Sequence, residues 1–305
     1  MSDQLTRFLF ENRAVRGEIV QLDKSYKSVM DSYHYPAPIA RLLGELMTAA
    51  SLLTATLKFE GEVSLQLQSE GIVKYAVING THDQQLRGVA RWDESIEALP
   101  ETFTELFHKG FLAITLAPYD GERYQGIVAL DQPSLAACLE NYFLQSEQLL
   151  TKIYLATDPV DKKLAAGMLL QIVPPNSETY QDSDNPDFEH LSHLANTTRD
   201  DELIELAPAD LVYRLFHEED IRIFEPKGVS FACDCSKKRS AQALQNVGKT
   251  ELLDIVKQDG SVKMDCQFCH ASYKFDAVDI ENIHSDKFSS FDESLFDGGE
   301  SKVKH

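Results

Sequence analysis

Four of the five cysteines stand in two short pairs near the end of this 305-residue chain. Cys233 and Cys235 form a C-x-C pair, and Cys266 and Cys269 form a C-x-x-C pair. Each pair can direct two sulfur atoms at one centre, and two such pairs complete the tetrahedral four-thiolate shell of a structural zinc ion. The spacing therefore predicts that one zinc ion is bound by all four cysteines.

The cysteines belong to a small unit, which we assign to residues 228–285. A unit of this size buries too little apolar surface to be stable alone, so zinc can act simply as a structural staple. A zinc-bound cysteine is also a thiolate, the form that oxidants attack, and Lys237, Lys238 and Arg239 add positive charge that favours it. Because zinc contributes on the order of 10 to 16 kcal/mol to the folding of such units, its loss on oxidation would unfold this one. The spacing leaves both interpretations open.

Other residues that can bind metal receive a structural interpretation. His270 directly follows Cys269, but four sulfurs already fill the shell, so we expect a surface residue. Cys138 has apolar neighbours at helical spacing and is expected to be buried and inert. His190 and His193 lie three residues apart and are expected on a solvated helix face. The aromatic residues of FLFEN, VKYAV and YKF occur at strand spacing and are expected to be core residues.

Residues 1–176 alternate strand-like and helix-like segments. The runs EVSLQLQSEG, IVKYAVING and LRGVARW have period-two alternation and turn residues between them, as in an antiparallel meander. The most apolar segment, about 39–57, contains Arg41 and Glu45, so we expect an amphipathic packed helix and not a membrane span. Consecutive strands and separate helices predict an α+β domain, with helices covering a mainly antiparallel sheet.

The composition changes after Pro175, where the acidic run SETYQDSDNPDFEH begins. Such a run predicts a linker or a loosely held segment, and we assign residues 177–227 to an acidic helical linker. Within it, DELIELAPADLVYRLFH carries one broad apolar face interrupted near Pro208, and that face has to pack on another part of the protein. The last residues, 286–305, are rich in Ser, Asp and Gly and are expected to be disordered.

The chain is strongly acidic, with a formal net charge of -20. This charge repels phosphate backbones, so we expect no nucleic-acid partner. The run MSDQLTRFLFENRAVRG lacks the uninterrupted apolar segment of a secretory signal, so we expect a cytoplasmic protein without a membrane partner. In a reducing cytoplasm, clustered cysteines are metal ligands or redox sensors more often than structural disulfides.

Two alternative functions use the same cysteines. The C-x-x-C pair of Cys266 and Cys269 is also the pattern of thiol-disulfide oxidoreductases, which predicts turnover in an insulin-reduction assay. That alternative leaves Cys233 and Cys235 without a role. A zinc-ribbon module for nucleic acid is the second alternative, and it predicts salt-sensitive binding that the acidic charge opposes.

The longer sequence context resembles a known family. The run FEPKGVSFACDCSKKRSAQALQNVGKTELLDIV, followed by MDCQFCHASYKFDAVDI, resembles the C-terminal domain of the 33 kDa chaperonins, which are redox-regulated heat-shock holdases. The runs YPAPIARLLGELMTAASLLTATLKFEGEVSLQLQSEG, NYFLQSEQLLTKIYLA and AAGMLLQIVP are similar to the N-terminal domain of that family. The resemblance covers nearly all of residues 1–285. It departs from the family at His270, where Asn is more usual, and in an acidic extension after the zinc domain.

The resemblance implies an ATP-independent holdase chaperone and not an enzyme, and the sequence shows no Walker or dinucleotide-binding glycine motif. In the reduced state the four cysteines would hold one zinc ion per chain in an inactive monomer. Oxidation would pair Cys233 with Cys235 and Cys266 with Cys269, release zinc, and unfold the C-terminal domain together with the linker. The exposed surface would then bind unfolding client proteins, and the active form would be a homodimer. The clients, their release, the oxidant and the exact binding surface do not follow from the sequence.

Overall fold

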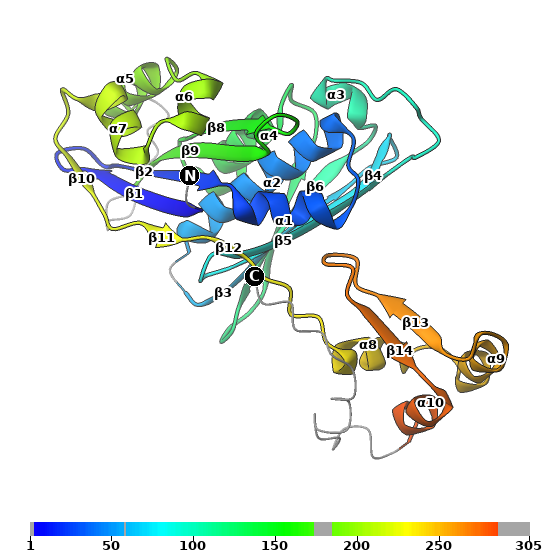
Figure 1. Cartoon of the computed structure of the whole chain (residues 1–305). Coiled ribbons are helices and arrows are strands. Elements are labelled where there is room, and N and C mark those ends of the chain that lie inside the picture. The colour runs from blue at the N-terminus through cyan, green and yellow to red at the C-terminus, as the bar shows by residue number, and fades with distance from the viewer. Residues whose placement is uncertain (1–2, 58, 174–184, 286–305) are drawn as a thin grey trace. The chain divides into compact units, whose positions relative to one another are not determined.

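The structure is a computed structural model that describes residues 3–57, 59–173 and 185–285 (Figure 1). The chain forms two compact units that divide between Ala232 and Cys233. The expected disordered tail, 286–305, and the start of the expected linker, 177–184, lie outside the described residues. The expected division into core, linker, zinc domain and tail therefore stays a prediction.

The first unit contains a six-stranded antiparallel sheet whose main strand order is β10-β1-β2-β9-β8, with β11 also paired to β1. Its strands are β1 (Gln4–Phe10), β2 (Val15–Leu22), β8 (Thr151–Asp158), β9 (Leu164–Ile172), β10 (Ile221–Ile223) and β11 (Lys227–Gly228). Strands from the two ends of this unit therefore meet in one sheet. The pairing ties the segment just before the cysteines to the N-terminal strand.

A second six-stranded sheet has the order β12-β5-β4-β3-β6-β7. Its strands are β3 (Gly61–Gln68), β4 (Val73–Thr81), β5 (Gln85–Trp92), β6 (Phe111–Pro118), β7 (Tyr124–Ala129) and β12 (Ser230–Phe231). Only β12 pairs in parallel, with β5, among the strands of this sheet that the structure describes. Buried and more exposed residues alternate along β3, as the period-two pattern predicts. The predicted α+β class with antiparallel sheets is confirmed.

Helix α2 (Ala37–Ala55) contacts strands of both sheets and forms the centre of the main core. The sequence predicts an amphipathic packed helix here, and the structure agrees: Arg41 and Glu45, one turn apart, stay partly exposed, whereas most other side chains are buried. Because strands of both sheets contact this helix, its buried face is wider than a single apolar stripe. The other helical elements within this part of the fold are α1 (Lys24–Ser32), α3 (Phe103–Leu106), α4 (Leu135–Tyr142) and the π-helical turn η1 (Phe143–Glu147). No helix within the described residues is long and apolar enough to cross a bilayer.

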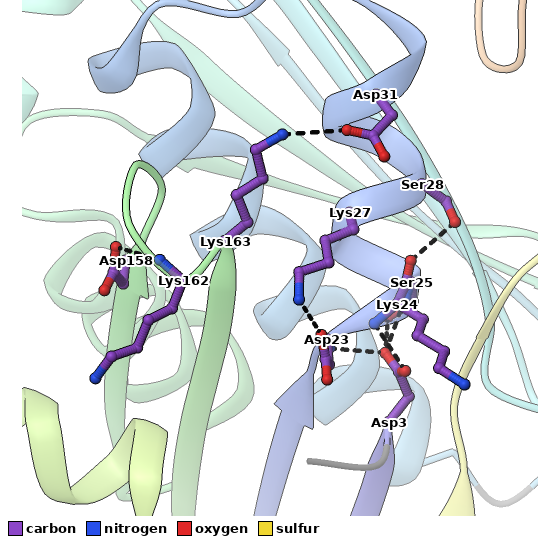
Figure 2. Close-up of polar contacts among 10 residues, drawn as sticks. All are labelled: Asp3, Asp23, Lys24, Ser25, Lys27, Ser28, Asp31, Asp158, Lys162 and Lys163. Atoms are coloured by element: carbon purple, nitrogen blue, oxygen red, sulfur yellow. Dashed lines mark hydrogen bonds and ion pairs between the residues drawn. The ribbon is translucent and has the colours of Figure 1, made fainter.

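The first turn of α1 is capped by Asp3, the residue just before β1, and Figure 2 shows this contact. The carboxylate of Asp3 accepts hydrogen bonds from the backbone N–H groups of Asp23, Lys24 and Ser25, each at 2.9 Å. It also accepts a hydrogen bond from the Ser25 hydroxyl. The negative charge therefore lies at the positive end of the helix dipole. At the other end of α1, Lys163 from the β8–β9 turn forms an ion pair with Asp31 at 3.1 Å.

Three helices from the expected linker pack on the face of the first sheet that points away from α2. They are α5 (Pro186–Ala195), α6 (Asp200–Glu205) and α7 (Pro208–Phe216). The shared apolar cluster joins sheet residues with helix residues, including Phe8, Phe10, Ile19, Met168, Leu170, Phe188, Leu191, Leu203, Leu211, Leu215 and Phe216. The apolar face of this segment thus finds the partner that its sequence requires, in the same compact unit as the two sheets.

Polar contacts also hold these helices to the first sheet. The buried Gln21 amide donates hydrogen bonds to the carbonyl oxygens of Leu203 at 3.0 Å and Leu206 at 2.7 Å. These carbonyls belong to the C-terminal end of α6, where a helix leaves carbonyl groups without partners of its own. Arg13, in the β1–β2 turn, bonds Glu219 through its Nε at 2.8 Å. Polar contacts therefore add to the apolar packing of these helices on the first sheet.

The second unit contains the four cysteines. Its elements are α8 (Lys237–Leu244), α9 (Lys249–Asp259), β13 (Val262–Asp265), β14 (Ser272–Phe275) and α10 (Ala277–Ile283). Two helices and a strand thus lie between the two cysteine pairs. The buried core of this unit consists of Ala241, Leu244, Leu252, Val262, Phe275, Ile280 and Ile283. Such a small core makes an additional stabilising element necessary.

Candidate metal centre

The four cysteine sulfurs converge on one point. The Sγ atoms of Cys233, Cys235, Cys266 and Cys269 all lie within 4.8 Å of one another. Sγ of Cys233 is 3.6 Å from Sγ of Cys266, and Sγ of Cys235 is 3.3 Å from Sγ of Cys269. A tetrahedral zinc ion with Zn–S bonds of about 2.3 Å requires sulfurs about 3.8 Å apart. Because a disulfide would require about 2.05 Å, the four residues are free thiols in a geometry that fits one metal ion.

The C-x-x-C pair lies at the hairpin between β13 and β14. The Cys266 N–H donates to the carbonyl of Ala271 at 2.8 Å, and the His270 N–H donates to the carbonyl of Cys266 at 2.9 Å. His270 closes this turn with a left-handed backbone, at a φ of 58°. Among residues with a side chain, Asn, Asp and His adopt this conformation most readily, so His can replace the more usual Asn. His270 is exposed, as expected, and the cluster of metal-ligating atoms does not include it.

The C-x-C pair lies in the extended segment before α8. Ser236, between this pair and the helix, accepts a hydrogen bond at its hydroxyl from the Arg239 N–H at 3.2 Å. This N-terminal cap ends the extended segment and starts α8 immediately after Cys235. The two halves of the metal centre are thus placed by two separate local structures, a capped helix start and a tight hairpin turn.

The hydrogen bonds at the sulfurs differ from one cysteine to the next. Burial raises the pKa of Cys266, but backbone hydrogen bonds from Cys269 and Phe268 outweigh it and hold the pKa below its usual value. Burial raises the pKa of Cys235 despite the hydrogen bond from Tyr273. Burial also raises the pKa of Cys269. Cys266 is therefore the thiol of these three that ionises most readily before any metal binds.

Two of the three basic residues beside the C-x-C pair, Lys237 and Arg239, have acidic partners. Lys237 forms an ion pair with Asp279 at 3.0 Å, and Arg239 forms one with Asp234. The sequence predicts that Lys237 and Arg239 add positive charge that favours the thiolates. The ion pairs show that this expectation overstates their effect, because each cation has a carboxylate beside it.

One contact of the centre comes from a residue that the sequence assigns to the core. The hydroxyl of Tyr273, in β14, donates a hydrogen bond to Sγ of Cys235 at 3.2 Å. Tyr273 is half-buried, whereas Phe275 in the same YKF run is fully buried as expected. Strand alternation predicted an inward-facing side chain, but it carries no information about a sulfur that lies 38 residues earlier.

The remaining candidates lie elsewhere. Cys138 is 1% exposed in α4, and burial raises the pKa of its thiol, as expected for an inert core cysteine. His193 is exposed, with Nδ1 2.9 Å from the carbonyl oxygen of Glu189. His190 is exposed as well, as expected, and its Nε2 lies 2.9 Å from a carboxylate oxygen of Glu219, the partner of Arg13.

Comparison with known proteins identifies relatives along nearly the whole chain. Residues 3–276 match the family described as Hsp33 protein. The 33 kDa chaperonin of Pseudoalteromonas atlantica is 57% identical over 288 residues, which cover 94% of this chain and 97% of that protein. The 33 kDa chaperonin of Shewanella sediminis is 51% identical over 283 residues, which cover 93% and 96% of the two chains.

A solved structure is similar in fold. The crystal structure of the 33 kDa chaperonin from Thermotoga maritima, a heat shock protein 33 homolog, matches with a TM-score of 0.77. The match covers 95% of this chain and 100% of that chain, at 20% sequence identity. At this identity the match shows a shared fold.

Proposed function

This chain belongs to the Hsp33 family of 33 kDa chaperonins, and from that premise we propose that a zinc ion on its four C-terminal cysteines holds the chaperone in its inactive state. The protein is a redox-regulated holdase and not an enzyme. Its four-cysteine cluster can hold a metal ion. The proposal concerns which ion is bound, what oxidation does to it, and which surface is then released.

The observation that carries the proposal is the convergence of four free sulfurs within 4.8 Å. Zinc accepts four thiolates in a closed tetrahedral site and requires no open position for a structural role. We assign Cys233, Cys235, Cys266 and Cys269 as its ligands, with one zinc ion per chain. Because the apolar core of this unit is small, metal binding supplies folding free energy that the side chains of the unit lack.

Oxidation removes these ligands in pairs. Two thiolates give two electrons to a peroxide, the O–O bond breaks to two hydroxide ions, and the sulfurs join in a disulfide. The family resemblance supports the pairs Cys233–Cys235 and Cys266–Cys269. Both pairs are close in sequence, so neither disulfide replaces the connection between the two cysteine motifs. The unit then loses both its metal and that connection, and it unfolds.

Unfolding of the second unit acts on the segment that precedes it. The chain runs from α7 through β10, β11 and β12 directly to Cys233. We infer that α5, α6 and α7 leave the first sheet after the second unit unfolds, as the family resemblance implies for this linker. Their departure exposes an apolar sheet surface that includes Phe8, Phe10 and Met168. This surface and the apolar faces of the freed helices would bind unfolding client proteins without ATP.

The assembly and location of the protein follow from the same mechanism. A contiguous exposed apolar surface favours association with a second copy of the chain. The oxidised form would therefore be a homodimer and the reduced form a monomer. The cytoplasm is the proposed location, because a reducing environment keeps the four thiols free to bind zinc.

The decisive experiment compares the reduced full-length protein with peroxide-treated protein. Zinc release is measured with a chromogenic chelator, and chaperone action by the light scattering of a thermally unfolding client. We expect oxidation to release one zinc ion per chain and to suppress aggregation, whereas the reduced protein does neither. Release of the metal without any protection of the client would refute the proposed link between the metal centre and the binding surface.

A further inference from the structure

We propose that the Tyr273 hydroxyl is a positioning group that protects Cys235 from oxidants and so sets how readily the metal centre opens. The inference rests on the proposed function, because it assumes that oxidation of these sulfurs is the signal. Tyr273 donates a hydrogen bond to Sγ of Cys235 at 3.2 Å. Its role is indirect, since it acts through the sulfur and does not react itself.

The position of Tyr273 connects the two halves of the centre. It lies in β14, on the hairpin that carries Cys266 and Cys269, and it pairs with Met264 of β13. Its hydroxyl reaches across to the C-x-C segment, which precedes α8. The side chain therefore fixes the distance between the hairpin and Cys235. Groups of this kind, which hydrogen-bond to a metal ligand, orient the ligand and tune its reactivity.

The hydrogen bond opposes the first step of oxidation. In that step the Cys235 thiolate attacks one oxygen of a peroxide, an S–O bond forms, the O–O bond breaks, and hydroxide or alkoxide leaves. The thiolate of a second cysteine then attacks this sulfur and displaces hydroxide, which completes the disulfide. The sulfur loses negative charge as the S–O bond forms, so a donor that stabilises this charge stabilises the starting state more than the transition state.

The expected effect follows from the strength of such bonds. Hydrogen bonds to charged groups are stronger than hydrogen bonds between neutral groups. When a hydrogen bond lowers the basicity of a thiolate, about 0.4–0.5 of that change, on a logarithmic scale, appears as a decrease in its rate of attack. Removal of the hydroxyl should therefore accelerate oxidation of Cys235 by roughly 3- to 10-fold.

The test uses reduced, zinc-loaded full-length protein as the wild type, as Tyr273→Phe, and as the matched control Tyr213→Phe. Tyr213 is 72% exposed in α7, in the other compact unit. Oxidation by hydrogen peroxide is quenched by alkylation, and mass spectrometry gives a second-order rate for each cysteine. We expect faster loss of the Cys235 thiol in Tyr273→Phe and an unchanged rate in Tyr213→Phe. A Cys235 rate within twofold of wild type in a Tyr273→Phe protein that retains its metal would overturn the inference.

A spectroscopic measurement separates this role from a structural one. With cobalt in place of zinc, loss of a hydrogen bond to sulfur should move the sulfur-to-cobalt charge-transfer band of Tyr273→Phe to longer wavelength, and an unmoved band would overturn the inference. If Tyr273→Phe does not hold metal, NMR of the cadmium-loaded wild-type protein tests the hydrogen bond of the Tyr273 hydroxyl directly. A Tyr273 hydroxyl proton protected from exchange supports the contact, and a rapidly exchanging proton overturns it.

The outcomes distinguish this inference from the proposed function. If the wild-type protein binds no metal, the proposed function fails and the role of Tyr273 fails with it. If wild type and Tyr273→Phe both bind one metal ion and lose the Cys235 thiol at equal rates, only the role of Tyr273 is refuted.

Discussion

Replacing Gln21 tests whether the α5–α7 segment restrains the chaperone. Gln21 is 3% exposed in β2, and its amide donates hydrogen bonds to the carbonyls of Leu203 and Leu206. Gln21→Leu keeps most of the side-chain volume but removes both donors. The segment would then dock with two carbonyl groups that lack their partner, whereas the undocked segment can satisfy them with water.

The magnitude follows from these two bonds. A buried polar group left without its partner costs about 1–3 kcal/mol. Leu203 is fully buried and Leu206 is half-buried, so we expect docking of the helices to weaken by about 2–4 kcal/mol in total. At 1.4 kcal/mol for each factor of ten, the docking equilibrium should shift by roughly 30- to 700-fold.

Hydrogen exchange of the reduced, zinc-loaded protein measures this shift. Backbone amides of α5, α6 and α7 should exchange faster in Gln21→Leu, and the protein should partly suppress client aggregation without oxidation. Gln125→Leu is the matched control, because Gln125 is exposed on β7 of the second sheet. If amides of α5–α7 exchange within twofold of wild type, the hydrogen bonds of Gln21 do not hold the segment.

Three further predictions concern the same scaffold. Burial opposes ionisation of Glu219, but its hydrogen bonds to His190 and Arg13 outweigh burial and lower its pKa in the folded state. The ionised carboxylate therefore stabilises the folded state at pH values above the unfolded-state pKa of about 4.3. This stabilisation is lost as the pH falls through the lower pKa of the folded state. Glu219→Gln should abolish that part of the pH dependence in urea unfolding between about pH 3 and 6, and an unaltered pH profile would contradict it. Asp3→Ala removes the acceptor for three backbone N–H groups at the start of α1 and should lower the free energy of urea unfolding by about 1–2 kcal/mol. A change below about 0.3 kcal/mol would show that the cap is not needed. Cys266→Ser should prevent stable metal retention, which elemental analysis of the purified reduced protein measures; one zinc ion per chain in this variant would show that Cys266 is not a ligand.

The sequence predicted the parts of the fold that depend on local pattern. Period-two alternation located β3, β4 and β5 of the second sheet, and Pro208 marked the interruption between α6 and α7. The cysteine spacing predicted a cluster of four sulfurs, because short C-x-C and C-x-x-C pairs leave few ways to place their side chains.

Contacts between distant segments were beyond the reach of these patterns. The wide buried face of α2 depends on two sheets whose separate existence no local period shows. The acidic composition after Pro175 suggested a loose segment, although the apolar face of α5–α7 packs on the first sheet. The ion pair of Lys237 with Asp279 and the hydrogen bond of Tyr273 to Cys235 each join residues about forty positions apart. A single sequence contains no signal for such pairings.

Metal content and compactness, measured together on the full-length chain, test the central claim most directly. Elemental analysis of reduced protein should give one zinc ion per chain, and hydrogen exchange should show protected amides in α8, α9 and α10. After peroxide treatment, both the metal and this protection should be lost together. A reduced protein without stoichiometric zinc, or an oxidised protein whose C-terminal unit stays equally protected, would contradict the account.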